Sequence, residues 1–201
     1  ILKKASISGQ ILLNGTDIST LSDGDWRQLR GTKISMIFQN PSAYLNPNRT
    51  VENHFKDLFR AHGESYEIAR VIDMLKLVHL NDGERILQSY PFQLSGGMQQ
   101  RLAIALSLIL RPSIVFADEP TSALDMLVQA SVLDLMKEVT QALGATVVIV
   151  THNIKSAAQI ANSIGVMNKG QLVEVGSTEE VMACPKDEYT RVLLDSVTKV
   201  V

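Results

Sequence analysis

Hydrophobic residues along the chain form short apolar runs separated by longer stretches with helical spacing. The short runs are bounded by turn residues such as Asn14-Gly15 and therefore predict strands. They lie at 8–13, 33–38, 114–117, 146–150, 164–167 and 172–175. The run at 146–150 is β-branched throughout, so we expect this strand to be buried on both faces.

Helical spacing predicts the elements between these strands. Ile68, Ile72, Leu75 and His79 mark one face of a helical block at 51–80, and a second apolar helix runs from the stretch LSGGMQQR to about residue 110. A third, long helix ends at Gly144. Its apolar stripe consists of Val128, Val132, Leu135, Met136, Val139 and Leu143. Shorter helices are expected at 153–161 and near the C-terminus. Alternation of strands and helices indicates an α/β fold with a parallel sheet.

Composition narrows the class of protein. The 201 residues are 45% hydrophobic and 20% charged, with a net charge of -2, which fits a folded domain with a sizeable core. No cluster of Lys and Arg is present, and this argues against a dedicated nucleic-acid binder. The lone Cys184 excludes an internal disulfide. The longest apolar run, 102–110, is far shorter than the roughly 20 residues that span a bilayer.

Polar residues follow three of the predicted strands directly. Asp118-Glu119 ends one strand, Thr151-His152 follows the next, and Gln39 follows the strand at 33–38. Because ligands gather at the carboxyl ends of parallel strands, we expect these residues to share one site. One carboxylate suits Mg²⁺ binding and the other suits accepting a proton from water. Each group taken alone is also compatible with an ordinary solvated turn or a structural histidine.

The stretch LSGGMQQR has features of a phosphate-binding helix start. Ser95 is a candidate N-cap, and Gly96 and Gly97 allow the backbone to approach an anion closely. The partial positive charge of a helix N-terminus favours phosphate at this position. The alternative interpretation is a flexible turn before a core helix.

Taken together, these motifs resemble those of the ATP-binding cassette ATPases. Gln39, LSGGMQQR, SIVFADEPTSALD at 113–125 and VTHN at 150–153 occur in the order and spacing of that family and cover essentially the whole chain. The resemblance implies an α/β, P-loop NTPase-like (RecA-like) parallel sheet with an inserted helical subdomain. It divides the chain into an incomplete ATPase core (1–50 and 112–176), a helical subdomain with the signature motif (51–111) and a C-terminal helical tail (177–201).

The same resemblance implies a role for each motif residue. Asp118 acts on the phosphates through Mg²⁺, Glu119 polarises the attacking water, and His152 contacts the γ-phosphate of ATP. Gln39 touches the metal and the water and relays contact with membrane subunits. Ser122 to Asp125 form a loop that crosses a dimer interface. The signature residues Ser95, Gly96, Gly97 and Met98 address the ATP held by the opposite subunit.

Finer similarity points to one branch of the family. The stretches 34–47, 89–101 and 184–197 resemble the oligopeptide, dipeptide and nickel importer ATPases, although the cargo itself stays open. This branch implies a second ATPase subunit, more often a different chain than a copy, together with membrane permease subunits and a substrate-binding protein. It also implies a location at the cytoplasmic face of the membrane. A DNA-repair or translation cassette is disfavoured by the acidic net charge and the importer-like tail.

One expected motif is absent from the printed sequence. None of the twelve glycines is followed by Lys, so no G-x-x-x-x-G-K-[ST] phosphate loop exists here. Either the sequence, which begins at Ile1 without a Met, is a fragment of a normal ATPase, or it is a non-catalytic partner that completes the site of another ATPase. The intact Glu119 and His152 favour a fragment. In both cases we expect the 201-residue chain alone not to turn over ATP.

Overall fold

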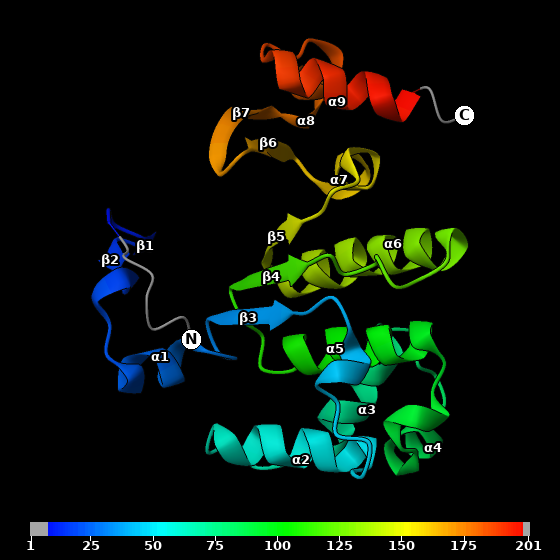
Figure 1. Ribbon diagram of the computed structural model, residues 1–201. Coiled ribbons are helices and arrows are strands. Elements are labelled where there is room, and N and C mark those ends of the chain that lie inside the picture. Colours follow the sequence, from blue (N-terminus) through cyan, green and yellow to red (C-terminus); the bar gives the residue numbers. More distant parts are fainter. Residues whose placement is uncertain (1–7, 199–201) are drawn as a thin grey trace.

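A three-stranded parallel sheet lies at the centre of the computed structural model, which describes residues 8–198 (Figure 1). The strand order is β3 (Ile34–Ile37), β4 (Ile114–Asp118) and β5 (Thr146–Val150). The register pairs Ile37 with Ala117 and Ala117 with Ile149. The predicted strands at 33–38, 114–117 and 146–150 and the parallel α/β class are therefore confirmed.

Two long helices cover one face of this sheet. α5 (Gly96–Leu108) and α6 (Met126–Leu143) share a hydrophobic core with Val115 and Ala117, which are completely or almost completely buried. The predicted stripe of α6 is confirmed, because Val132, Leu135, Met136 and Val139 are buried in this core. Gly144 ends α6 in a left-handed conformation, which a residue without a Cβ adopts easily.

The opposite face of the sheet is apolar and uncovered among the described residues. The register aligns Met36, Phe116 and Val148 on it, and their exposed fractions are 43%, 39% and 42%. The expectation that 146–150 is buried on both faces is therefore wrong: only its alternate residues Val147 and Ile149 pack against the core. β-branched composition indicates a strand, but whether both faces are covered depends on what packs above them.

Short helices form a separate layer next to α5 (Figure 1). They are α2 (Val51–Ala61), α3 (Ile68–Leu77) and α4 (Gly83–Gln88). The predicted stripe through this block is partly wrong. Ile68 is 53% exposed, and His79 lies beyond the end of α3 with a φ of 59°. The buried side of α3 consists instead of Val71, Met74 and Leu75, because that side faces α4 and α5.

The N-terminal strands are much shorter than expected. The predicted strand at 8–13 is reduced to β1 (Leu12–Leu13), which pairs with β2 (Thr16–Asp17) around the Asn14-Gly15 turn. α1 (Asp23–Leu29) and a short 3-10 helix, η1 (Ile18–Thr20), follow. Figure 1 shows this segment to one side of the central sheet.

The elements after residue 153 form a second small core. α7 (Ile154–Ile160) leads into β6 (Ser163–Asn168) and β7 (Gln171–Ser177), an antiparallel hairpin that does not join the parallel sheet. α8 (Thr178–Ala183) and α9 (Glu188–Thr198) complete it. Its buried residues are Ile154, Ile164, Val166 and Val181. The remaining 3-10 turns are η2 (Pro41–Ala43) and η3 (Pro91–Gln93).

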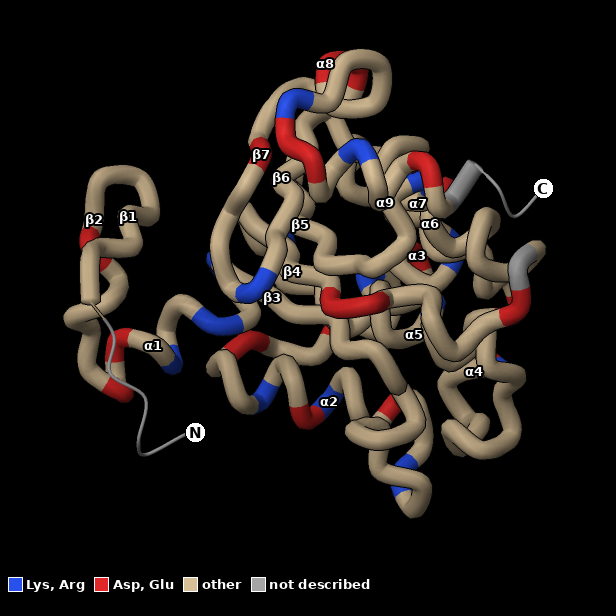
Figure 2. The backbone as a smooth tube through the Cα atoms, turned by 45° about the horizontal axis from the view of Figure 1, so that its top comes forward, with Lys and Arg blue, Asp and Glu red and all other residues tan. Residues whose placement is uncertain are grey.

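The division into core, helical subdomain and tail stays a prediction, and residues 1–7 and 199–201 lie outside the described part. Charged residues of both signs are interspersed along the backbone (Figure 2). No helix in the described range 8–198 is both long and apolar enough to cross a bilayer.

The Glu174 carboxylate anchors the segment before α9. Its Oε1 accepts the backbone N–H of Lys186 at 2.8 Å and its Oε2 accepts that of Asp187 at 3.1 Å. The hydrogen bond from Lys186 is the main cause that lowers the pKa of Glu174 below its ordinary value of 4.5. The ionised form is therefore the one that the fold stabilises.

We predict that Glu174→Gln lowers the free energy of unfolding at neutral pH. Because the folded-state pKa lies below the unfolded one, the stabilisation is complete above the unfolded value and disappears as the pH falls through the folded value. Urea unfolding between neutral pH and pH values below about 4 would show the difference between wild type and variant shrinking with acidity. Glu67→Gln is the matched control, since Glu67 makes no side-chain capping bond. A Glu174→Gln difference that stays constant with pH would contradict the prediction.

Candidate active site

The residues predicted to share a site all lie at the carboxyl edge of the parallel sheet. Gln39 follows β3, Asp118 ends β4 with Glu119 directly after it, and His152 follows β5. Hydrogen bonds join Gln39 to Glu119 through Ser122, and a direct hydrogen bond joins Glu119 to His152. The structure thus brings together residues that are separated by more than a hundred positions in the sequence. Their chemical roles stay predictions.

Glu119 and His152 form the tightest contact of this cluster. The Oε1 atom of Glu119 lies 2.6 Å from Nδ1 of His152 and accepts the backbone N–H of the same residue at 3.0 Å. An ionised carboxylate only accepts hydrogen bonds, so Nδ1 carries the proton and Nε2 is left for another group. The imidazole is 78% exposed, whereas the Glu119 side chain is 21% exposed. The histidine therefore orients the carboxylate and still faces solvent.

The backbone of Glu119 is held in an unusual conformation. Its φ is 46°, in the left-handed region, although Pro120 follows and favours an extended residue before it. Such a conformation costs about 1–3 kcal/mol and persists only where neighbouring contacts impose it. Here the N–H of Glu119 donates to the Val150 carbonyl at 2.9 Å, and its own carbonyl accepts the N–H of Ser122 at 3.3 Å. The strained backbone at the end of β4 thus determines where this carboxylate lies.

Ser122 connects Gln39 to Glu119, a link that sequence reasoning missed. The Nε2 of Gln39 donates to Oγ of Ser122 at 2.9 Å, and this hydroxyl donates to the Glu119 carbonyl at 3.2 Å. The sequence places both residues near the site, but nothing in their spacing predicts that their side chains meet.

Asp118 presents an exposed carboxylate that makes no hydrogen bond or ion pair with its side chain among residues 8–198. Together with the amide oxygen of Gln39 it offers oxygen donors, which suit Mg²⁺. No group of three or more His, Cys, Asp or Glu residues that could hold a metal occurs in the described chain. The donor set therefore fits an ion that keeps water or phosphate oxygens as its other ligands.

No hydrogen bond among the described residues joins the signature residues to this cluster. Ser95 caps α5, with its Oγ accepting the N–H of Met98 at 3.3 Å, so the predicted N-cap is confirmed. Asp125 caps α6 in the same way, accepting the N–H of Val128 at 3.0 Å. Both side chains thus have a structural function within the chain. Binding of a nucleotide by these residues stays a prediction.

Gly96 and Gly97 are the first residues of α5 and pack against the beginning of α6. A Cβ at Gly97 would lie 3.0 Å from a methyl group of Val128, whereas a Cβ at Gly96 would lie 3.6 Å from Leu124. A side chain at Gly97 would therefore force Val128 to shift, so helix packing alone favours a glycine at this position, whether or not an anion binds there.

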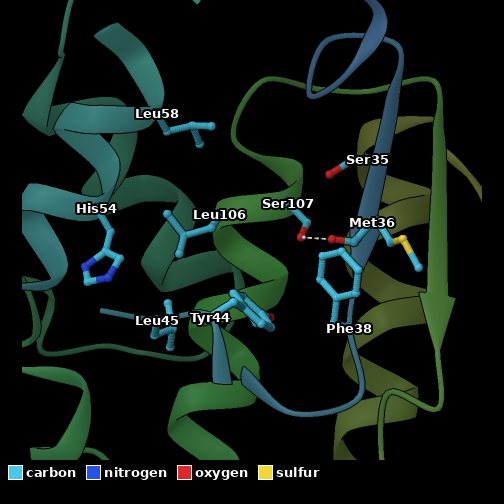
Figure 3. Close-up of a pocket in the computed structure, with 10 residues that line it drawn as sticks. Ser35, Met36, Phe38, Tyr44, Leu45, His54, Leu58, Leu106 and Ser107 are labelled. Atoms are coloured by element: carbon cyan, nitrogen blue, oxygen red, sulfur yellow. Dashed lines mark hydrogen bonds between the residues drawn. The ribbon is translucent and has the colours of Figure 1, made fainter. Parts of the chain in front are cut away.

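A second feature is a hollow of about 370 Å³ beside the outer edge of β3 (Figure 3). It lies between β3, the segment after Gln39, α2 and α5. Its lining is mostly apolar and includes Phe38, Tyr44, Leu58 and Leu106. The rings of Phe38 and Tyr44 meet edge to face, with 5.5 Å between their centroids. No pattern in the sequence predicts this hollow, because its lining residues come from distant segments.

Comparison with known proteins places these motifs in a family. A model of the ABC transporter family matches residues 1–122. The dipeptide transport ATP-binding protein DppD of Caldanaerobacter subterraneus subsp. tengcongensis is 41% identical over 198 residues, covering 96% of this chain and 60% of that protein. The glutathione import ATP-binding protein GsiA of Salmonella paratyphi A is 42% identical over 184 residues, which cover 90% of this chain and 30% of that protein.

A solved structure agrees in fold. The dimeric ATP-binding cassette MJ0796, in a post-hydrolysis state with ADP and Pi, superposes with a TM-score of 0.72 and 30% sequence identity. The match covers 85% of this chain and 74% of that one. The chain also spans only about 60% of the length of the DppD protein described above. The fold is therefore that of an ABC ATPase, with its parallel sheet and helices.

We predict that Gly97→Ala is less stable than Gly96→Ala. Replacing a helical glycine by alanine otherwise stabilises a helix by up to about 1 kcal/mol. The added methyl group at Gly97 must displace Val128, whereas the one at Gly96 meets ordinary contact distances. We expect Gly97→Ala to lose about 1 kcal/mol or more relative to Gly96→Ala. Chemical unfolding of both variants measures this difference in the free energy of unfolding. Equal values would show that Val128 can move aside without loss of stability, and would contradict the prediction.

Proposed function

Because the chain belongs to the ABC transporter family, we propose that it is the ATP-hydrolysing part of an importer subunit. The contact between Glu119 and His152 at the carboxyl edge of the sheet is the observation that carries this proposal. A carboxylate that is oriented by a histidine and placed beside a second, exposed carboxylate suits activation of a water molecule. Phosphoryl transfer depends on such positioning and on charge stabilisation, with no need for a nucleophilic side chain.

Each residue of the cluster then has a distinct task. Glu119 accepts the proton of the attacking water, and the Nδ1–H of His152 holds the carboxylate in place, so that Nε2 faces the phosphate. Asp118 and the amide oxygen of Gln39 would hold Mg²⁺, which, when bound, offsets the negative charge of the phosphates. The strained backbone of Glu119 fixes the direction of its carboxylate before any ligand arrives.

Peptides are the cargo class that we propose for the whole transporter. Support comes from the names of the relatives, which transport dipeptides and oligopeptides or import glutathione. Nickel does not occur among these names. The subunit would act at the cytoplasmic face of the membrane with a permease, a substrate-binding protein and a second, different ATPase subunit.

The apolar hollow next to β3 is our proposed contact with the permease. Its lining includes Phe38, the residue before Gln39, and His54 and Leu58 of α2, so a segment bound there would touch both the end of β3 and the helical layer. Exposed apolar side chains at Phe38 and Tyr44 favour an apolar partner segment.

A second candidate is a non-catalytic partner that completes the site of another ATPase. The observation that favours it is the capped α5 N-terminus, which no hydrogen bond within the described chain joins to the Glu119 cluster. In this case the signature residues would serve a nucleotide that is bound by the other subunit.

We predict that the 201-residue chain alone binds MgATP weakly and releases no phosphate. Titration calorimetry and a phosphate-release assay test this, and micromolar affinity with turnover would contradict it. When a phosphate-loop segment of a relative is fused before Ile1, turnover should appear, and Glu119→Gln should reduce it by about 10²-fold or more while ATP still binds. Glu138→Gln, on the exposed side of α6, is the matched control. If turnover appears only after mixing with a separate phosphate-loop subunit, the partner interpretation holds.

We predict that Tyr44→Glu weakens binding to the permease by about tenfold or more. A charge in the hollow must be desolvated when an apolar segment covers it. Pull-down titration with detergent-solubilised permease measures the affinity, and the unfolding midpoint verifies that the variant is folded. Val192→Glu on α9 is the control, because Val192 is also well exposed but lies far from the hollow in sequence and fold. Equal loss in both variants would exclude the hollow as the contact.

A further inference from the structure

The Ser122 hydroxyl lies between two groups that constrain its single hydrogen. Its oxygen lies 3.2 Å from the carbonyl of Glu119 and 2.9 Å from Nε2 of Gln39. A backbone carbonyl can only accept, so the hydroxyl must be the donor in the first of these contacts. Having used its one hydrogen there, it can only accept from Gln39. In this arrangement the Gln39 amide presents its NH₂ group to Ser122.

We propose that Ser122 is a positioning residue that fixes the amide of Gln39, with Nε2 held inside the cluster and Oε1 left free as a ligand. The orientation of the amide does not depend on the proposed function. Only the role of the free Oε1 as a ligand rests on it. Among the described residues, no hydrogen bond engages Oε1 of Gln39. Oxygen is the atom that a magnesium ion or a water molecule to be oriented requires from an amide.

The energetic preference for this orientation comes from the second hydrogen bond. If the amide were flipped, Ser122 would have to donate to the Gln39 oxygen and could no longer donate to Glu119. The flipped arrangement thus loses one hydrogen bond, worth about 1 kcal/mol, which corresponds to about fivefold in population. The Glu119 carbonyl would keep only the N–H of Ser122, at 3.3 Å.

The same hydroxyl joins the ends of β3 and β4, and the Glu119 carboxylate extends the link to β5. Gln39 follows β3 and contacts Ser122, Ser122 contacts the backbone of Glu119 after β4, and the Glu119 carboxylate contacts His152 after β5. A displacement of Gln39 is therefore transmitted to the residue that we propose as the base. Without the hydroxyl, Gln39 would be an exposed side chain whose amide turns freely.

Side-chain NMR tests the orientation directly on the 201-residue chain. In ¹⁵N-labelled protein, the NH₂ resonances of Gln39 are identified by their disappearance in Gln39→Ala. We expect one of these protons to exchange slowly with water in the wild type. Its exchange should accelerate about fivefold in Ser122→Ala, as one hydrogen bond of about 1 kcal/mol is lost, and recover in Ser122→Thr, which keeps a hydroxyl.

The matched control is Ser107→Ala. Ser107 donates to the Met36 carbonyl on β3 at 3.2 Å, so its loss perturbs the same strand without touching the amide. A second variant, Gln39→Glu, replaces the amide that donates to Ser122 by a carboxylate and leaves Ser122 itself unchanged. Its carboxylate cannot donate, so the backbone amide resonance of Ser122 should shift as it does in Gln39→Ala.

Three results would overturn the proposal: unchanged exchange in Ser122→Ala, failure of Ser122→Thr to restore slow exchange, or a Ser122 resonance unmoved by Gln39→Glu. None of these measurements involves ATP. A failed turnover experiment would therefore leave the positioning role intact, and a failed NMR experiment would leave the proposed hydrolysis intact.

Discussion

The parallel register of β3, β4 and β5 is the constraint on which the candidate site depends. Since the strands run in the same direction, their carboxyl ends lie at one edge, and the residues that follow them become neighbours. The hydrogen bonds from Gln39 through Ser122 and Glu119 to His152 then tie the three ends together. A slip in register of one residue would separate these side chains and turn apolar residues to the other face of the sheet.

The site contains a strained backbone conformation that neighbouring hydrogen bonds stabilise. Glu119 adopts a left-handed backbone, stabilised by its bond to Val150 and by the turn that Ser122 closes. The packing of α5 and α6 on one face supports this arrangement through the buried Val115 and Ala117 of β4. The other face carries an exposed apolar row that includes Met36, Phe116 and Val148. Parallel sheets normally carry cover on both faces, whereas the described chain covers only one face of this sheet.

Features that depend on near neighbours in the sequence were predictable. Ser95 as an N-cap, Gly144 as a helix stop and the buried stripe of α6 follow from hydrogen bonds and packing within a few turns. Features that depend on distant packing were not. The buried side of α3 is set by α4 and α5, and so Ile68 and His79 lie outside the core. The strand at 8–13 shrinks to two paired residues because the described chain offers it only β2 as a partner.

The sequence by itself determined the α/β class, the order of the elements and which residues follow the central strands, because periodicity and motif spacing are local properties. It also established the family resemblance and the absence of a phosphate loop. Only the tertiary structure decided that Ser122 joins Gln39 to Glu119, that a side chain at Gly97 would press against Val128, and that one face of β5 is uncovered among the described residues. Contacts between segments far apart in the chain depend on how layers pack, and the pattern within each segment does not encode that packing.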